Sequence, residues 1–412
     1  MDTAAKRWLS WNILLKNLTN PDGAIKWIED SIVNRVKAVN PTYDAKFILY
    51  YCPCDSLLYN LAATAIDGSG TAVQPPGTPG APVAGKGDVL VVSENNKMDE
   101  DTVQIRLSEK ATSLSNITPG SNEGSKNILG IIDTGFDPAL FPSFIKDLIW
   151  KPSPGKHEFN FIDGSKDNYF DDHKNKHGSG VAALALHQMD NAGSVRPRLM
   201  ILKALDKNKH GSTFTVSCAL SYAIQNNARV VNASLGYYEM NKKVDSVFRH
   251  YIKLCSSATP NSIFIISAAG NTAPPHPGNK LCDSAMNSNE LKSSRLFYPA
   301  CFSDEMQNVI TVTGLSSGNS GACFFQNYSA KYVTLGVKNK LTCCSFHIPI
   351  FLNNVEGSSF ATPIVSGLVM DCLGTSSTST LSCIQSKTIA DPSRVSFTKD
   401  GRLMVYDDQK IW

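Results

Sequence analysis

The apolar residues near the N-terminus follow a helical rhythm. Five of them recur at steps of three and four: Ile25, Ile28, Ile32, Val36 and Val39. This spacing predicts one apolar face of an amphipathic helix that ends before Pro41. The run KFILYY (46–51) then predicts a strand, and Asp55 is placed to cap a second helix over SLLYNLAATAI (56–66). Residues 1–66 are therefore expected to form a small α-β-α unit, an α+β region of its own.

A break in composition follows this region. Ten of the twenty-one residues from Asp67 to Gly87 are Gly or Pro, which predicts a linker or a long exposed loop. After it, DVLVVS (88–93) and TVQIRL (102–107) predict two strands in an extension over 88–126. This extension leads into a main domain over 127–412.

The main domain has the pattern of an α/β protein. Continuous apolar runs alternate with segments of helical character, and each run shows little polar alternation, as in strands buried on both faces of a parallel sheet. The runs are NILGIID (127–133), RLMILKAL (198–205), ARVVNASLG (228–236), SIFIISAAGN (262–271) and NVITVTG (308–314). Several end in small or turn-forming residues, where parallel sheets place their functional sites.

Composition and charge exclude several classes of protein. Hydrophobic residues make up 42% of the 412 residues, which excludes global disorder. A net charge of +3 offers no electrostatic case for binding nucleic acid or a membrane surface. No apolar run approaches a membrane span, and polar residues interrupt the short apolar patch near the N-terminus, so we expect no secretory signal. The odd count of 11 cysteines favours reduced thiols and a cytoplasmic location.

Three polar side chains stand at the ends of predicted elements. Asp133 follows a buried strand in IIDTG, His177 opens the small-residue run HGSGVAAL, and Ser359 lies in GSSFATP at the start of a predicted helix. Taken singly, a turn aspartate, a surface histidine and a helix-capping serine are the plainer interpretations. Together they supply an acid, a base and a hydroxyl nucleophile in the chain order Asp, His, Ser.

With these motifs in that order, residues from about 127 to 373 resemble a subtilisin-like serine protease. The resemblance implies a mostly parallel sheet with helices on both faces. It also implies a catalytic triad of Asp133, His177 and Ser359. Ser358 and Phe360 stand where the family often has Thr and Met, and neither substitution touches the triad.

The resemblance extends to the substrate side. Asn271 in SAAGN corresponds to the family's side-chain donor to the oxyanion. Residues 232–236 resemble the family strand that pairs with substrate and walls the specificity pocket. The resemblance therefore implies substrate-binding roles for a small group of residues: Ser234, Leu235, Gly236, Ala269 and Gly270.

Other sites are weaker. Cys52-Pro53-Cys54 is too closely spaced for the usual zinc pair, and no oxyanion element accompanies Cys52 as a nucleophile. The aspartates over 163–172 offer carboxylates that calcium binds, but the EF-hand spacing is absent, and we expect a solvated loop. We predict no metal site and no required cofactor, with structural calcium left as an alternative.

The sequence thus predicts an intracellular serine endopeptidase that acts on protein or peptide substrates through an acyl-enzyme. Residues 1–66 are expected to be a recognition or regulatory region that binds a regulatory partner. The alternative is a catalytically silent subtilisin-like fold that serves as a protein-binding module. We expect no nucleic-acid or membrane partner.

Overall fold

The computed structural model describes most of the main domain and parts of the N-terminal region. The described residues are 9–16, 20–37, 47–52, 54–63, 89–94, 97–98, 127–151, 160–162, 168–189, 197–239, 245–258, 262–272, 289–317, 321–340, 342–348, 354–375 and 379–407. The predicted linker over 67–87 and the predicted strand over 102–107 lie outside them.

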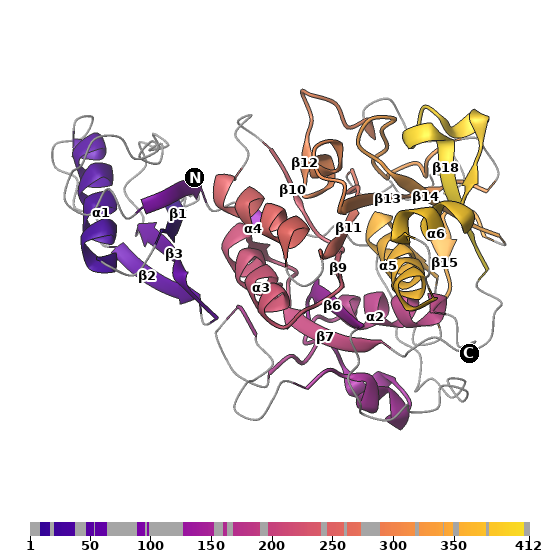
Figure 1. The fold of residues 1–412 in the computed structure, drawn as a ribbon, viewed down its shortest axis with the longest axis horizontal. Helices are drawn as coiled ribbons and strands as arrows, with labels where there is room; N and C mark the ends of the chain where they lie inside the picture. Colours follow the sequence, from indigo (N-terminus) through magenta and orange to yellow (C-terminus); the bar gives the residue numbers. More distant parts are fainter. Residues whose placement is uncertain are drawn as a thin grey trace, which may run out of the picture. The chain divides into compact units, whose positions relative to one another are not determined.

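An eight-stranded sheet organises the main domain (Figure 1). Its strand order is β17-β18-β14-β13-β11-β9-β6-β7, and all neighbours are parallel except β17 and β18. The bounds are β6 Ile128–Asp133, β7 Arg198–Lys203, β9 Val230–Ala233, β11 Phe264–Ala268, β13 Val309–Leu315, β14 Leu335–Asn339, β17 Ile389–Ala390 and β18 Arg402–Tyr406. All five apolar runs predicted as buried strands are confirmed.

Two buried helices pack together beside this sheet. They are α2 (His177–Gln188) and α5 (Ser358–Thr375), and α5 also contacts β9, β11 and β13. The absence of a side chain at Gly367 of α5 lets the two helices approach closely, since a Cβ there would lie 2.6 Å from the carbonyl oxygen of Ala185 in α2. Their facing side chains fill the main apolar core, so the first turns of both helices are held firmly.

Further helices and strands surround the main sheet or belong to its loops. They are β5 Lys97–Met98, β8 Gly211–Ser212, α3 Thr213–Gln225, β10 Tyr237–Tyr238, α4 Ser246–Ser257, β12 Phe297–Tyr298, β15 Ser345–Phe346, β16 Val355–Glu356 and α6 Thr380–Ser386. β10 pairs with β12, and β15 pairs with β16, both antiparallel. The Tyr298–Pro299 peptide bond is cis.

The N-terminal region forms an antiparallel sheet with one helix. The sheet order is β2-β3-β1-β4, from β1 (Leu9–Leu15), β2 (Phe47–Cys52), β3 (Asp55–Ala63) and β4 (Val89–Glu94), and α1 spans Pro21–Lys37. The predicted first helix and the strand at KFILYY are confirmed. The predicted second helix is wrong, because residues 55–63 form a central strand hydrogen-bonded on both sides.

The boundary predicted after the linker also differs from the structure. Strand β4 lies within the expected extension over 88–126, yet it pairs with β1 of the N-terminal sheet. By spatial contacts, one compact unit comprises Met1–Lys97, Ser212–Tyr222 and Val244–Tyr251, and the second holds the rest. The N-terminal sheet thus groups with residues of α3 and α4, elements that come much later in the sequence.

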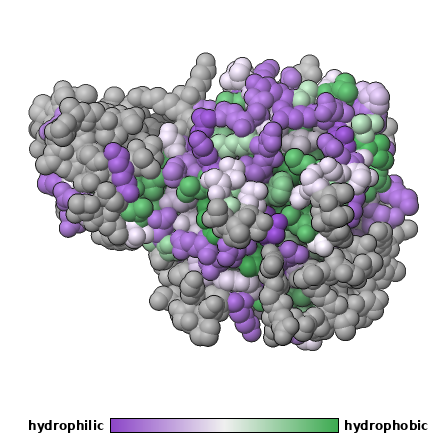
Figure 2. Space-filling view, viewed as in Figure 1, coloured by the Kyte–Doolittle hydropathy of each residue, from purple (hydrophilic) through white to green (hydrophobic). Residues whose placement is uncertain are grey.

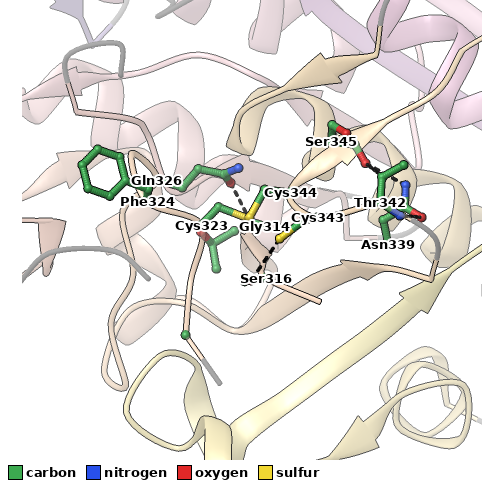
Figure 3. The surroundings of a disulfide bond; sticks show 12 residues. Gly314, Ser316, Cys323, Phe324, Gln326, Asn339, Thr342, Cys343, Cys344 and Ser345 are labelled. Carbon is green, nitrogen blue, oxygen red and sulfur yellow. Dashed lines mark hydrogen bonds between the residues drawn. A yellow bond between two sulfur atoms is a disulfide. The ribbon is translucent and has the colours of Figure 1, made fainter. Parts of the chain in front are cut away.

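Within the described residues, two disulfides cross-link the main domain. Cys323 pairs with Cys344, and Cys372 at the end of α5 pairs with Cys383 in α6. Figure 3 shows the first bond, with the thiol of the adjacent Cys343 turned toward Ser316 (3.3 Å). The expectation of reduced thiols is wrong for these four cysteines. Since that expectation supported a cytoplasmic location, the location stays a prediction without this support.

Figure 2 shows hydrophilic side chains interspersed with smaller apolar groups on the visible face. Among the described residues, no helix is both long and apolar enough to cross a bilayer.

Candidate active site

Asp133 and His177 form a buried hydrogen-bonded pair. Asp133 ends β6 and His177 begins α2, and neither side chain is exposed to solvent. The Asp133 Oδ1 atom lies 2.8 Å from His177 Nδ1 and also accepts the main-chain N–H of Thr134 (2.7 Å). This contact fixes the imidazole ring at the carboxyl edge of the sheet and favours the proton on Nδ1.

A second buried carboxylate holds this pair in place. Asp171 accepts the hydroxyl of Thr134 (2.9 Å), and both the main-chain N–H and the hydroxyl of Ser179 (3.0 and 2.8 Å). Burial raises the pKa of Asp171. Since Thr134 follows Asp133 and Ser179 lies in the first turn of α2, Asp171 joins the two elements that carry the pair. The expectation of a solvated acidic loop is wrong at this residue, which is fully buried.

A buried lysine supports the same loop from the sheet. Lys203 at the end of β7 donates to the carbonyl oxygens of Thr134 (2.6 Å) and Phe170 (3.0 Å) and pairs with Asp172. Sequence inspection places Lys203 only in an apolar strand. The one signal available is a charged residue at the carboxyl end of a buried run.

Ser359 lies in the first turn of α5. His177 packs against the neighbouring Phe360, with ring centroids 4.8 Å apart, which brings the histidine to the start of this helix. Among the described residues, Ser359 Oγ has no hydrogen-bond partner although it is buried. A hydroxyl in that state is available to a group that enters from outside the described chain.

Pro363 changes the hydrogen bonding of this turn. Within a helix, the N–H of residue 363 would donate to the carbonyl oxygen of Ser359, but proline has no N–H. The hydroxyl of Ser234 donates to that carbonyl oxygen instead (2.7 Å). Pro363 lies inside the helix, because α5 begins at Ser358, five residues earlier.

Asn271 reaches the same helix start from the end of β11. Its Oδ1 accepts the main-chain N–H of Ser358 (3.0 Å) and its hydroxyl (3.1 Å). Gly357 has φ +119, and a Cβ built there would lie 3.2 Å from Asn271 Nδ2 and 3.4 Å from Ser359 Oγ. The absence of a side chain at Gly357 thus leaves a space that faces an amide donor and a hydroxyl together.

The predicted substrate-binding residues follow two strands of the sheet. Residues 234–236 come directly after β9, and residues 269–270 come between β11 and Asn271. An aromatic ring fills the space next to both of their glycines. A Cβ at Gly236 would lie 2.4 Å from Cε1 of Phe297, and one at Gly270 would lie 2.9 Å from the same atom. The resemblance also implies that residues 297–300 lie beside the pocket, but the contact of the Phe297 ring with both glycines comes from the structure. Leu235 is buried, and the carbonyl oxygen of Ala269 accepts the side-chain amide of Asn327 (2.8 Å).

Two titratable groups near the site have shifted pKa values. Burial, with the nearby His177 as the next cause, lowers the pKa of His173 to about 4. Burial raises the pKa of Glu356 to about 7. Glu356 directly precedes Gly357, so its charge at neutral pH borders the candidate site.

No metal centre accompanies these residues in the part of the chain that the structure describes. There, no three His, Cys, Asp or Glu side chains are grouped so that they could hold a metal ion. The aspartates over 163–167 lie outside the described residues.

Residues 124–374 match the model of the Subtilase family, a peptidase family, over more than half of the chain. The chain belongs to the subtilase family. Curated relatives agree. This subtilase is 26% identical to a thermophilic serine proteinase of Bacillus sp. (strain AK1) over 262 residues, which cover 61% of this chain and 52% of the relative. It is 28% identical to subtilisin-like protease 3 of Plasmodium falciparum over 182 residues, 42% of this chain and 22% of that protein.

A solved structure reproduces the fold of almost the whole subtilase. It is that of an epidermin leader peptide processing serine protease from Staphylococcus aureus, with a TM-score of 0.58, 15% sequence identity and 98% coverage of both chains. At that identity the similarity concerns the fold alone. Family membership supports serine peptidase activity and implies a peptide or protein substrate.

Proposed function

We propose that this subtilase is a serine endopeptidase in which Ser359 is the nucleophile, His177 the general base and Asp133 the residue that orients it. Ser359 Oγ attacks the substrate carbonyl carbon while His177 accepts the hydroxyl proton. The C–N bond then breaks as His177 returns the proton to the leaving amine. Water hydrolyses the resulting acyl-enzyme by the same route.

The arrangement around Gly357 carries this proposal. The Asn271 amide and Ser359 Oγ both face the space that a side chain at Gly357 would fill. An oxyanion in that space would accept a hydrogen bond from the Asn271 side-chain amide. It would also lie at the N-terminus of α5, where the N–H groups of the helix favour negative charge. The Asp133–His177 contact of 2.8 Å supports the role of the base.

The substrate chain is proposed to lie between two segments, 234–236 and 269–270. Because the ring of Phe297 fills the space beside Gly236 and Gly270, little volume is left there for a large side chain. We therefore propose that the substrate residue bound in this slot is small.

Regulation by the N-terminal region is proposed from contacts within its compact unit. The amide of Asn12 donates to the Thr213 hydroxyl (2.9 Å) and to Asp245 (3.3 Å). Asp55 accepts the hydroxyls of Ser221 (2.8 Å) and Tyr251 (2.6 Å). Since α3 and α4 belong to the stretch that matches the family model, a change in these contacts would reach the peptidase domain.

A fluorophosphonate probe, which reacts with activated serines, tests the function. The purified full chain is incubated with the probe, with and without cell extract, and the labelled residue is mapped by mass spectrometry. Labelling of Ser359 without extract supports a constitutive peptidase, and labelling only with extract supports a regulated one. Absence of labelling in both cases would instead favour a silent fold that binds proteins.

We also propose that the enzyme needs no cofactor and that it is cytoplasmic. The proposed chemistry uses only side chains and water, so labelling should survive dialysis against a metal chelator. Labelling lost on dialysis and restored by calcium would contradict this. The proposed cytoplasmic location is tested by fractionation of cells that contain the protein.

A further inference from the structure

A phenol hydroxyl lies behind the candidate oxyanion donor. Tyr238 is the second residue of β10, and its hydroxyl donates a hydrogen bond to the main-chain carbonyl oxygen of Asn271 (2.9 Å). The side-chain amide of Asn327 donates to the same hydroxyl (2.7 Å), and so does the guanidinium group of Arg295 (2.8 Å). Side chains from three separate segments therefore converge on the main chain of Asn271.

The donors around the Tyr238 oxygen determine where its hydrogen points. A phenol oxygen accepts hydrogen bonds as well as donating one. Because Asn327 and Arg295 both donate to it, the Tyr238 hydrogen is directed to an acceptor. The carbonyl oxygen of Asn271 lies at 2.9 Å, closer than the side-chain oxygen of Asn327 at 3.1 Å. The Tyr238 hydroxyl is thus oriented as a donor to Asn271.

Arg295 strengthens this donor and holds its ring. The guanidinium carbon lies 4.7 Å from the centroid of the Tyr238 ring, while Nη2 donates to the hydroxyl. Hydrogen bonds in a chain polarise one another, so a cation that donates to the hydroxyl strengthens the bond that the hydroxyl gives. The Tyr238 ring also packs edge-on against Phe297, with centroids 4.9 Å apart. The ring is therefore fixed from two sides.

Asn327 extends the contact to the turn before Asn271. Its amide also donates to the carbonyl oxygen of Ala269 (2.8 Å), and its main-chain N–H donates to that of Gly270 (3.0 Å). Gly270 has φ +86, a left-handed conformation in which the chain turns after β11. Tyr238 thus holds Asn271 directly and, through Asn327, the turn that leads to it.

We propose that Tyr238 is a positioning residue for the oxyanion donor. Its hydroxyl fixes the main chain of Asn271, so that the side-chain amide points into the space at Gly357. The role rests on the function proposed above, in which that amide donates to the oxyanion. Asn271 Oδ1 accepts the main-chain N–H of Ser358 (3.0 Å), which leaves Nδ2 for the oxyanion. Without the Tyr238 hydroxyl, Asn271 would lose this orientation.

The kinetics of Tyr238→Phe test the proposal, because Phe keeps the ring and removes only the hydroxyl. We expect kcat for a fluorogenic peptide to fall about 10- to 100-fold with little change in KM, since a small displacement of a catalytic group costs that much. Tyr406→Phe is the matched control. It removes a buried hydroxyl that contacts His187 in the last turn of α2, and it should leave kcat unchanged. An unchanged kcat in Tyr238→Phe would overturn the proposal.

A double-mutant cycle separates positioning of Asn271 from a general structural role. In the Asn271→Ala background the amide is absent, so adding Tyr238→Phe should change kcat by less than about twofold. Equal effects of Tyr238→Phe in both backgrounds would make its role structural and overturn the proposal. If Tyr238→Phe fails to fold, Arg295→Met replaces it in the same cycle, because it removes a donor to the hydroxyl.

Crystal structures provide a readout that needs no activity. Tyr238→Phe is compared with its parent, both in the Ser359→Ala background. We expect Asn271 to lose its contact with the Ser358 N–H while the ring at residue 238 stays against Phe297. An unmoved Asn271 side chain would overturn the proposal. If the wild type neither hydrolyses peptides nor reacts at Ser359, the proposed function fails, and the crystal structures still decide whether Tyr238 positions Asn271.

Discussion

The hydroxyl of Ser234 donates a hydrogen bond to the main-chain carbonyl oxygen of Ser359 (2.7 Å). The donor lies just after β9 and replaces the N–H that Pro363 lacks. Ser234 also accepts the amide of Asn232 (2.9 Å), and Asn232 in turn accepts the hydroxyl of Ser366 one helical turn after Thr362. The start of α5 is therefore held to the sheet by side chains, and the position of Ser359 depends on them.

Loss of this donor should disturb both the fold and the site. We predict that Ser234→Ala lowers the free energy of unfolding by about 1–3 kcal/mol, because a buried carbonyl loses its partner. It should also slow labelling of Ser359 by a fluorophosphonate. Ser303→Ala is the control, since Ser303 donates to the buried carbonyl of Tyr332, away from α5. Equal effects of both variants on labelling would argue against a positioning role for Ser234.

The two adjacent serines should differ sharply. We predict that Ser359→Ala reduces peptide hydrolysis on the order of a million-fold, a magnitude known from subtilisin itself, a member of this family. Ser358→Ala should retain most activity, because among the described residues the Ser358 hydroxyl donates only to Asn271 Oδ1. The Ser358 carbonyl oxygen, which the substitution keeps, accepts the Thr362 hydroxyl. Hydrolysis of a fluorogenic peptide measures both. Activity lost in Ser358→Ala and kept in Ser359→Ala would reverse the assignment.

Asn271 should act mainly in the transition state. We predict that Asn271→Ala lowers kcat about 100- to 1,000-fold with little change in KM, since an oxyanion forms only as the carbonyl is attacked. Steady-state kinetics separate the two constants. Ser358→Ala removes one contact of Asn271 without removing its amide, and it should leave kcat close to that of the wild type. A defect confined to KM in Asn271→Ala would contradict the role.

Phe297 should limit the size of the substrate side chain beside Gly236 and Gly270. We predict that Phe297→Ala raises the ratio of kcat/KM for large over small residues by about 10- to 200-fold, the usual range for steric discrimination in a pocket. Peptides that vary at the position before the cleaved bond measure the ratio. Phe302→Ala is the control, because Phe302 is a buried ring that packs on Tyr298. An unchanged ratio in Phe297→Ala would remove Phe297 from the pocket.

Glu356 should make stability depend on pH. Its pKa in the folded protein is about 7, above the ordinary value of 4.5, so the folded state binds more protons between these pH values. Stability contributed by the protonated form is therefore lost as the pH rises through 7. We predict that Glu356→Gln, in the Ser359→Ala background, is more stable than its parent near pH 8 by on the order of 1 kcal/mol, and not near pH 4. Urea unfolding measures the free energy of unfolding of both variants. If the difference between them is the same at pH 8 and at pH 4, the prediction is refuted.

The strands of the main sheet were predictable because buried parallel strands leave continuous apolar runs that need no knowledge of their neighbours. The N-terminal sheet was harder. Residues 55–63 carry Leu and Ala, which favour helices, yet β3 lies between β1 and β2, and its pairing on both sides overrides that preference. Strand β1 was missed because its ladder partners lie about 50 and 80 residues away in the sequence.

By itself, the sequence determined the fold class and the identities of Asp133, His177, Asn271 and Ser359 as candidates, because short motifs at strand and helix ends carry that information locally. Only the tertiary structure decided what surrounds them. The buried Asp171, the bond from Ser234 to Ser359 and the ring of Phe297 between two glycines all depend on contacts between distant segments. The contact of the Cys54 thiol with the main chain of Cys218 has the same origin. Such contacts follow from how elements pack, and no local pattern of residues encodes them.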